Sequence, residues 1–296
     1  MDTITLRTFI ALAEIKNFTK TAQQLFVAQS TVTNRIRDLE RELGTSLFIR
    51  NHKQVDLTPA GQKFLDYAQR FITLETAALQ DLQTSPAYTE KITIGTTNTI
   101  YECHLQKKIR AYLHAHPSTS LGVTISHTQD MLHRLQEGTL DAVFSFSASF
   151  QDGYICQPYR TDTLVLVCQA QNTEYAAGIY KKDLQKIDYL FCNFALQGVG
   201  LYIRDLFPRY HRFPLEIDNS TKLPQYVAEG LGYTFLPRSL IEDDLLQGRI
   251  RAIPLLDFAP PKVDSYYITR NPTTIPEILE SFLLHSPAPA LSSSST

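Results

Sequence analysis

Amide, hydroxyl and guanidinium side chains are concentrated between positions 29 and 37 of this chain. They are Gln29, Ser30, Thr31, Thr33, Asn34, Arg35 and Arg37. Amides and hydroxyls can hydrogen-bond to base edges and phosphates, and a guanidinium group can bind a phosphate or a guanine. The same residues could form an ordinary solvated helix surface, and periodicity alone does not separate the two interpretations. The chemistry available to this stretch is recognition of double-stranded DNA.

Apolar residues are predicted to position this polar face. One stripe at helical spacing consists of Val32, Ile36, Leu39 and Leu43. A shorter apolar face before it consists of Ala22, Leu25 and Phe26. The turn between the two is formed by residues 27–29, and a first helix over 5–15 is expected to pack behind them. The segment from Phe18 to Leu47 therefore predicts a helix-turn-helix.

Two short strand-like runs, SLFIR and QVDLT, follow this segment and flank a turn at 51–53. They predict a two-stranded wing whose basic residues, Arg50 and Lys53, reach a phosphate or a minor groove. The alternative is a plain exposed hairpin. Residues 1–58 contain eight Lys and Arg against six Asp and Glu, although the whole chain has a net charge of -2. The cationic excess thus lies where DNA contacts are expected.

These residues resemble the DNA-binding domain of LysR-type transcriptional regulators. Three ordered blocks carry the resemblance: LRTFIALAEIKNFTKTAQQL, VAQSTVTNRIRDLERELGTSLFIR and VDLTPAG. It covers the first sixty positions, and the remaining chain follows the same family's domain order as far as the helix near Ile278. The resemblance implies a winged helix-turn-helix that binds promoter DNA. The DNA-contacting residues that we predict are Gln29, Ser30, Thr31, Thr33, Asn34, Arg37, Arg50 and Lys53.

The sequence departs from the family pattern at four positions, which are Asn17, Thr21, Ala28 and Asn34. Ala28 stands where the family usually has Ser or Thr. The predicted recognition helix therefore lacks a hydroxyl cap, which is worth about 1 kcal/mol. These departures concern the operator contacts, whereas the class of function follows from the rest of the resemblance.

A long helix is predicted to begin at Pro59, because Thr58 supplies a capping hydroxyl and proline is tolerated in the first turn. Steps of three and four residues give the spacing of a coiled-coil seam with one polar interruption. The seam residues are Leu65, Ala68, Ile72, Glu75, Leu79 and Leu82. Such a helix has little of its own domain to pack on, so we expect it to pair with a second copy of the chain. In the family that the chain resembles, this is the dimerising linker helix.

From residue 91 onward, strand-like runs alternate with helical stretches, which predicts βαβ units and largely parallel sheets. The strand-like runs are ITIG, LGVTIS, DAVFSF, TLVLVC, DYLFCN, PLEID and GYTFLP. The resemblance implies a two-lobed α/β effector module similar to a type 2 periplasmic solute-binding protein. The expected fold is thus a multidomain α/β protein with an N-terminal winged helix-turn-helix. The predicted boundaries are 1–58 for the winged domain, 59–83 for the linker helix, 84–90 for a hinge, 91–161 with 265–286 for lobe I, 162–264 for lobe II and 287–296 for a disordered tail.

Hydroxyl and amide side chains follow several predicted strands. In open α/β sheets, ligands bind at the carboxyl ends of strands and near helix N-termini, where an anion is favoured. The effector-binding residues predicted on this basis are Thr96, Thr97, Asn98, Thr99, Thr128, Ser145, Asn193 and Ser220. The alternative is that these residues only cap their helices. We expect the turns after the strands to converge on one cleft that binds a small anionic metabolite between the lobes.

Other classes of function lack their signatures. The sequence has no GxSxG, GxGxxG, P-loop or paired catalytic carboxylates, so neither an enzyme nor a cofactor is expected. The four cysteines are interpreted as reduced thiols because they lack CxxC spacing; they are Cys103, Cys156, Cys168 and Cys192. The eight histidines show no HExxH arrangement, so no metal site is expected. No apolar run reaches the roughly 18 residues of a membrane span, and no secretion signal is visible, so the sequence predicts a cytoplasmic protein.

Two alternative functions remain weaker interpretations of this sequence. A transport-type solute-binding protein would share the C-terminal fold, but it would need a secretion signal and has no use for a helix-turn-helix. An architectural DNA-binding protein would leave the two lobes without a task. The expected partners are therefore promoter DNA, a small-molecule effector and further copies of the chain, as a dimer or a dimer of dimers.

Overall fold

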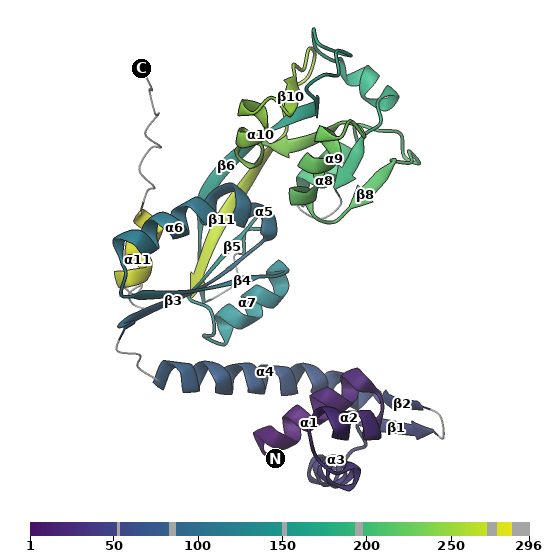
Figure 1. The fold of residues 1–296 in the computed structure, drawn as a ribbon, viewed down its shortest axis with the longest axis vertical. Helices are drawn as coiled ribbons and strands as arrows, with labels where there is room; N and C mark the ends of the chain where they lie inside the picture. The colour runs from purple at the N-terminus through teal and green to yellow at the C-terminus, as the bar shows by residue number, and fades with distance from the viewer. Residues whose placement is uncertain (52–53, 83–86, 150–152, 193–197, 271–276, 286–296) are drawn as a thin grey trace. The chain divides into compact units, whose positions relative to one another are not determined.

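The computed structural model describes residues 1–51, 54–82, 87–149, 153–192, 198–270 and 277–285. The chain divides into two compact units, Met1–Ser85 and Pro86–Thr296 (Figure 1). Each unit has hydrophobic clusters of its own. The predicted tail at 287–296 lies outside the described residues, and so do residues 84–86 of the predicted hinge.

The first unit contains three short helices, a hairpin and one long helix. These elements are α1 (Thr3–Ile15), α2 (Phe18–Gln24), α3 (Gln29–Leu43), β1 (Phe48–Asn51), β2 (Gln54–Leu57) and α4 (Pro59–Leu82). β1 and β2 pair antiparallel, as the predicted wing requires. Phe9 is fully buried and its ring contacts those of Phe48 and Phe64, at 5.4 Å and 5.2 Å between centroids. The core therefore joins α1, the hairpin and α4.

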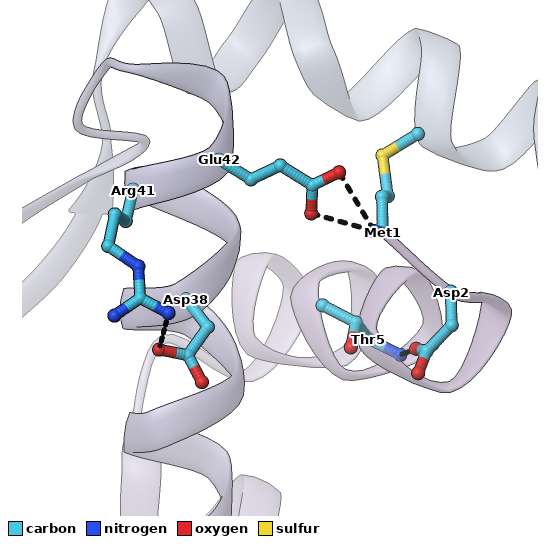
Figure 2. Close-up of polar contacts among 6 residues, drawn as sticks. All are labelled: Met1, Asp2, Thr5, Asp38, Arg41 and Glu42. Carbon is cyan, nitrogen blue, oxygen red and sulfur yellow. Dashed lines mark hydrogen bonds and ion pairs between the residues drawn. The ribbon is translucent and has the colours of Figure 1, made fainter.

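Short polar side chains set the starts of the first two helices. The carboxylate of Asp2 accepts a hydrogen bond from the Thr5 amide at 2.7 Å, and Asn17 accepts one from the Lys20 amide at 3.0 Å. The N-cap of α3 is Ala28, which makes no side-chain capping bond. The missing cap that the sequence predicts is thus confirmed. Figure 2 shows the Asp2 cap, together with the ion pairs of Met1 with Glu42 and of Arg41 with Asp38.

Two members of the predicted apolar faces lie outside the core, so this part of the prediction is wrong. Phe26 is 94% exposed and takes a left-handed backbone conformation with φ +54° in the turn, which directs its ring away from the core. Leu43 is 37% exposed because α3 ends there and the chain turns at Gly44, whose φ is +65°. Val32, Ile36 and Leu39 are buried as predicted.

The long helix α4 begins at Pro59 and contains 24 residues. The hydroxyl of Thr58 accepts a hydrogen bond from the Gly61 amide at 2.9 Å, so the predicted cap is present. Gly61 packs so closely that a Cβ atom there would lie 2.1 Å from the carbonyl oxygen of Leu47. A glycine in the first turn is therefore required for α4 to approach the end of the helix-turn-helix.

The predicted coiled-coil seam mostly faces the protomer's own core, which corrects the prediction. Ala68 is fully buried there, and Leu65 and Ile72 pack against the same cluster. Glu75 accepts hydrogen bonds from the Thr3 hydroxyl at 2.6 Å and from Arg7 at 3.5 Å. A pattern of three and four residues marks one buried helix face without specifying what covers it, and here α1 covers most of it.

The second unit contains nine described strands, arranged in sheets with both parallel and antiparallel pairs. They are β3 (Glu90–Thr96), β4 (Thr119–Ile125), β5 (Ala142–Ser145), β6 (Tyr154–Gln169), β7 (Leu190–Cys192), β8 (Leu215–Ile217), β9 (Thr234–Pro237), β10 (Ile250–Ile253) and β11 (Lys262–Arg270). β3 pairs parallel with β4 and β5, and β7 pairs parallel with β8. β6 pairs antiparallel with β9, β10 and β11, and β11 does so with β5. The predicted parallel pairing is therefore present within each lobe, but the sheets are mixed, because every antiparallel pair among the described strands of this unit involves β6 or β11.

Helices flank these strands. They are α5 (Asn98–Ile100), the π-helical turn η1 (Tyr101–Leu105), α6 (Gln106–Ala115), α7 (Thr128–Gln136), η2 (Lys181–Lys186), α8 (Gly198–Arg204), η3 (Ser220–Lys222), α9 (Leu223–Ala228), η4 (Arg238–Leu240), α10 (Glu242–Leu246) and α11 (Glu277–Leu284). α5, η1 and α6 follow one another without a break, so residues 98–115 form one helical run.

The unit has two lobes with separate hydrophobic clusters. Lobe I, built on β3, β4, β5, α5 to α7 and α11, has Phe144 and Phe282 in its core. Lobe II, built on β7 to β10 and α8 to α10, has Tyr189 and Phe235 in its core. The strands β6 and β11 lie side by side and run through both (Figure 1). Phe146, which follows β5, packs against both clusters.

Candidate functional site

The candidate DNA-contacting side chains of α3 lie opposite its buried stripe. Gln29, Ser30, Asn34 and Arg37 are exposed, and Thr31 and Thr33 are half-buried. The Gln29 amide donates to the Thr33 hydroxyl at 3.0 Å, and Arg37 donates to the Asn34 side-chain oxygen at 2.9 Å. These bonds link neighbouring turns of the helix and hold the amide and guanidinium groups in place. The arrangement can present hydrogen-bond donors and acceptors to base edges.

The neighbouring cations differ in their surroundings. Arg35 donates to the hydroxyl of Thr8 on α1 at 3.1 Å, so it ties α3 to its own domain. Lys16 pairs with Asp56 of β2 at 3.0 Å and so joins the end of α1 to the wing. The side chain of Arg50 and the whole of Lys53 lie outside the described part of the structure.

The candidate effector residues of lobe I lie at the ends of three neighbouring strands. Thr96 is the last residue of β3 and pairs with Phe144 of β5 and Ile125 of β4. Because β3 is parallel to both neighbours, the turns that follow all leave the same edge of the sheet. The Thr128 hydroxyl lies 3.0 Å from that of Ser145, so the turns after β4 and β5 are bonded to each other. The ends of β3, β4 and β5 therefore lie side by side at one edge of lobe I.

The hydroxyls at this edge do not act as helix caps. Thr97 and His127 are the N-cap residues of α5 and α7, and neither makes a side-chain capping bond. The Thr97 hydroxyl oxygen is buried and has no hydrogen-bond partner among the described residues. Thr96 is fully buried, and its hydroxyl donates to the Thr97 carbonyl oxygen at 3.1 Å. An unpaired buried hydroxyl costs free energy, so Thr97 is an unusual feature of this edge.

Two hydrogen bonds connect this edge with lobe II. The Asn98 amide donates to the Thr221 hydroxyl at 3.2 Å, and the Thr99 and Ser220 hydroxyls lie 2.8 Å apart. Thr99 and Ser220 are both buried. A molecule that used these groups would have to replace the bonds between the lobes. Asn193, the remaining predicted residue, lies outside the described residues.

The sequence indicated one further feature only weakly and did not indicate another. Thr221 follows Ser220 before the same predicted helix, so the hydroxyl pattern that indicates Ser220 extends to it, and in the structure it is the direct partner of Asn98. An exposed apolar stripe on α4 consists of Tyr67, Phe71 and Leu74, which are 52%, 52% and 49% exposed. Their spacing of four and three residues is visible in the sequence and repeats that of the buried face beside it. Burial, which the sequence does not display, distinguishes the two faces.

Among the described residues, no helix is both long and apolar enough to cross a membrane. No cluster of three or more His, Cys, Asp or Glu in the described ranges could hold a metal ion. Burial raises the pKa of the Cys103 thiol to about 12, which keeps it protonated at neutral pH.

Models of two protein families match this chain. Residues 4–62 match the bacterial regulatory helix-turn-helix protein family of the lysR type, and residues 87–286 match the LysR substrate binding domain. The two matches cover the winged domain and the two lobes in that order. Both are parts of a transcriptional regulator and not of an enzyme.

Curated relatives span nearly the whole chain. The HTH-type transcriptional regulator YwqM of Bacillus subtilis is 32% identical over 86% of this chain and 88% of its own length. YusT of the same organism, also an HTH-type regulator, is 29% identical over 96% of this chain and 94% of its own. The crystal structure of CbnR complexed with its target DNA superposes with a TM-score of 0.74 and 22% identity, covering 96% of this chain and 98% of CbnR.

Proposed function

We propose, because the chain belongs to the LysR family of DNA-binding transcriptional regulators, that it reads promoter DNA as a dimer or a dimer of dimers and responds to a small anionic metabolite bound between its two lobes. The proposed effector site rests on one observation. The buried hydroxyl of Thr97, at the shared edge of β3, β4 and β5, has no hydrogen-bond partner among the described residues. A cytoplasmic location follows from the DNA partner.

The α3 side chains support the proposed mode of DNA reading. Gln29, Thr33 and Asn34 would meet base edges, and Arg37 a guanine or a phosphate. Ser30 and Thr31 lie in the first turn of α3, where the amides lack a side-chain cap and can donate to a phosphate. Arg50 and Lys53 on the wing would add phosphate affinity without reading sequence.

Dimerisation through α4 is supported by its exposed apolar stripe. Tyr67, Phe71 and Leu74 leave half of each side chain in water, and Leu82 is 81% exposed. Pairing two such stripes would bury aromatic and aliphatic surface at about 25 cal/mol per Å². The stripe lies beside the face that packs on α1, so a second helix can cover it without disturbing the winged domain's core.

The effector would exchange hydrogen bonds within the protein for hydrogen bonds to itself. Thr97 offers a donor that is not yet used, and Asn98, Thr99 and Ser220 offer donors that now join the lobes. The uncapped amides at the start of α7 add a positive partial charge beside Thr128 and Ser145. Neutral donors and helix dipoles suit one or two carboxylate or sulfate groups better than a polyphosphate, which needs a cluster of cations.

The test is a thermal-shift screen of the full chain against a panel of mono- and dicarboxylates and inorganic sulfate. A specific ligand raises the unfolding midpoint by mass action. Thr97→Val keeps the shape and removes the hydroxyl, and it is expected to weaken that ligand about five- to tenfold. Thr173→Val, at an exposed threonine of a lobe II loop, is the matched control and should bind like the wild type. Full affinity in Thr97→Val would show that the site is misplaced.

Coupling to DNA is tested by reciprocity. If the ligand changes the affinity for operator DNA by some factor, saturating operator must change the ligand's affinity by the same factor, typically about 5- to 150-fold. Calorimetric titrations of the ligand with and without operator measure both sides of this cycle. Identical ligand affinities in the two titrations would rule out equilibrium regulation by that ligand.

A further inference from the structure

A buried carboxylate lies where β6 passes from one lobe to the other. Asp162 is 9% exposed and pairs in register with Val263 of β11. Two residues later, Leu164 begins the pairing with β9 of lobe II. Asp162 therefore lies in the segment of β6 that connects the two lobes. A change in the angle between the lobes would alter the surroundings of this segment.

Each oxygen of this carboxylate is bound from a different lobe. His104 of η1, in lobe I, places its Nε2 atom 2.6 Å from Oδ2 of Asp162. Ser239 of η4, in lobe II, donates its hydroxyl to Oδ1 at 2.9 Å. The side chains of His104 and Asp162 are only 12% and 10% exposed, so water competes little for these bonds. One ionised group thus holds a lobe I side chain and a lobe II side chain at once.

Asp162 is ionised at neutral pH. Burial raises its pKa, but the hydrogen bond and charge of His104 and the hydrogen bond from Ser239 outweigh burial, and the pKa lies below its ordinary value. A carboxylate needs donors, so His104 carries the hydrogen on Nε2 when it binds this group. Loss of either donor leaves a buried carboxylate oxygen unpaired, which raises the free energy of the closed arrangement in which the other bond is made.

The same helical run carries both this contact and the candidate effector residues. At its start, Asn98 and Thr99 bond to Thr221 and Ser220 of lobe II. Within it, the π-helical turn is closed by the bond from the Gln106 amide to the Tyr101 carbonyl. This wider turn contains His104, and π-helical turns of this kind often occur at functional sites. The run therefore meets lobe II at one end and again at η1.

We propose that Asp162, His104 and Ser239 form a single junction that fixes the angle between the two lobes and opens as one unit. As far as this junction serves regulation, the proposal rests on the proposed function, in which an effector replaces the Asn98 and Thr99 bonds. The angle between the lobes would then change as the junction opens, and the effector need not touch the junction, which shares no residue with the effector site. His104 and Ser239 act here as positioning residues and not as ligand contacts.

Hydrogen exchange of the full chain, measured by mass spectrometry without DNA or effector, tests the junction. Ser239→Ala changes only lobe II, yet we expect it to speed amide exchange in residues 101–106 of lobe I about fivefold or more. His104→Ala changes only lobe I and removes the donor, and we expect a similar increase in residues 236–241 of lobe II. A side chain with a purely local role would alter exchange in its own lobe alone.

Thr161→Ala is the matched control, because Thr161 also gives a hydroxyl to a carboxylate, that of Asp264 at 2.6 Å, but joins β6 to β11 at an exposed position. It should leave exchange in both 101–106 and 236–241 unchanged. If Ser239→Ala affects only lobe II, the two oxygens act independently and the junction is refuted. That outcome leaves the proposed regulator function intact, because neither DNA nor ligand enters the measurement.

Discussion

All the candidate DNA-contacting side chains that the structure describes belong to one helix, α3, whereas the candidate effector residues come from the ends of three strands and from both lobes. The first set is linked within itself by contacts three or four residues apart, such as Arg37 with Asn34. The second is linked by contacts such as Thr99 with Ser220, 121 positions apart. The candidate DNA-binding site is thus formed by local structure within one helix. The candidate effector site depends on how segments distant in the sequence are held together.

The largest effect is expected at the α4 stripe, through which we propose that two copies of the DNA-reading helix are joined in one dimer. Phe71→Asp with Leu74→Asp would put two carboxylates into an apolar interface, and the dimer dissociation constant should rise at least about 100-fold. Thr76→Asp, at an exposed position roughly opposite the stripe on the helix, is the control and should leave the dimer intact. Light scattering across a concentration series measures this, and a wild type that is monomeric at all concentrations would refute pairing through α4.

An intermediate effect is expected from the DNA-reading helix itself. Arg37→Ala should cost about 1 to 3 kcal/mol of operator binding if it reads a guanine, and it should relax specificity at one position. Lys53→Ala should weaken all sequences alike and lower the salt slope by about one. Fluorescence anisotropy with a selected operator and a scrambled duplex separates the two. Unchanged operator affinity in a Gln29, Thr33 and Arg37 triple alanine variant would show that α3 does not read this DNA.

Sequence reasoning identified the local features of the first unit and erred where burial decides. The stripe of Val32, Ile36 and Leu39 and the cap at Thr58 depend on neighbours within a few turns, so periodicity and residue type were sufficient. Phe26 looked like a core residue, but a left-handed turn exposes it. The residues predicted for the coiled-coil seam mostly face the protomer's own core, because two neighbouring faces of α4 both have apolar spacing and only the packing of α1 shows which of them it covers.

In the second unit, the sequence indicated the strand ends but not their partners. Thr97 and Thr128 were found because hydroxyls follow apolar strands, which is a local pattern. The bond of Asn98 to Thr221, and the placement of His104 and Ser239 on Asp162, join residues that are 58 or more positions apart in the chain. No periodicity links such residues. The passage of the chain between the lobes near residues 161 and 265 was predicted, and in the structure Thr161 pairs with Asp264 there, but its antiparallel direction was not predicted, because direction follows from the path of the chain through both lobes.

The smallest effect is expected from pH, and it concerns the bonds that join the two lobes. The folded-state pKa of Asp162 lies below its ordinary value of 3.8, so its contribution to stability is present above that value and is lost as the pH falls through the folded pKa. The groups that face Asp162 are His104, Ser239, Arg160 and Cys103. Asp162→Asn keeps the shape and removes the titrating carboxylate.

The difference in unfolding midpoint between wild type and Asp162→Asn should therefore be constant above about pH 5 and shrink below about pH 4. Thermal unfolding of both proteins across this range measures it. Asp264→Asn is the control, because that carboxylate accepts the Thr161 hydroxyl at an exposed position and joins no lobes. A midpoint difference for Asp162→Asn that stays the same down to about pH 3 would mean that the ionised carboxylate contributes nothing. In that case the lobes would be held together by packing, such as that of Phe146 on both clusters, and not by the shared carboxylate.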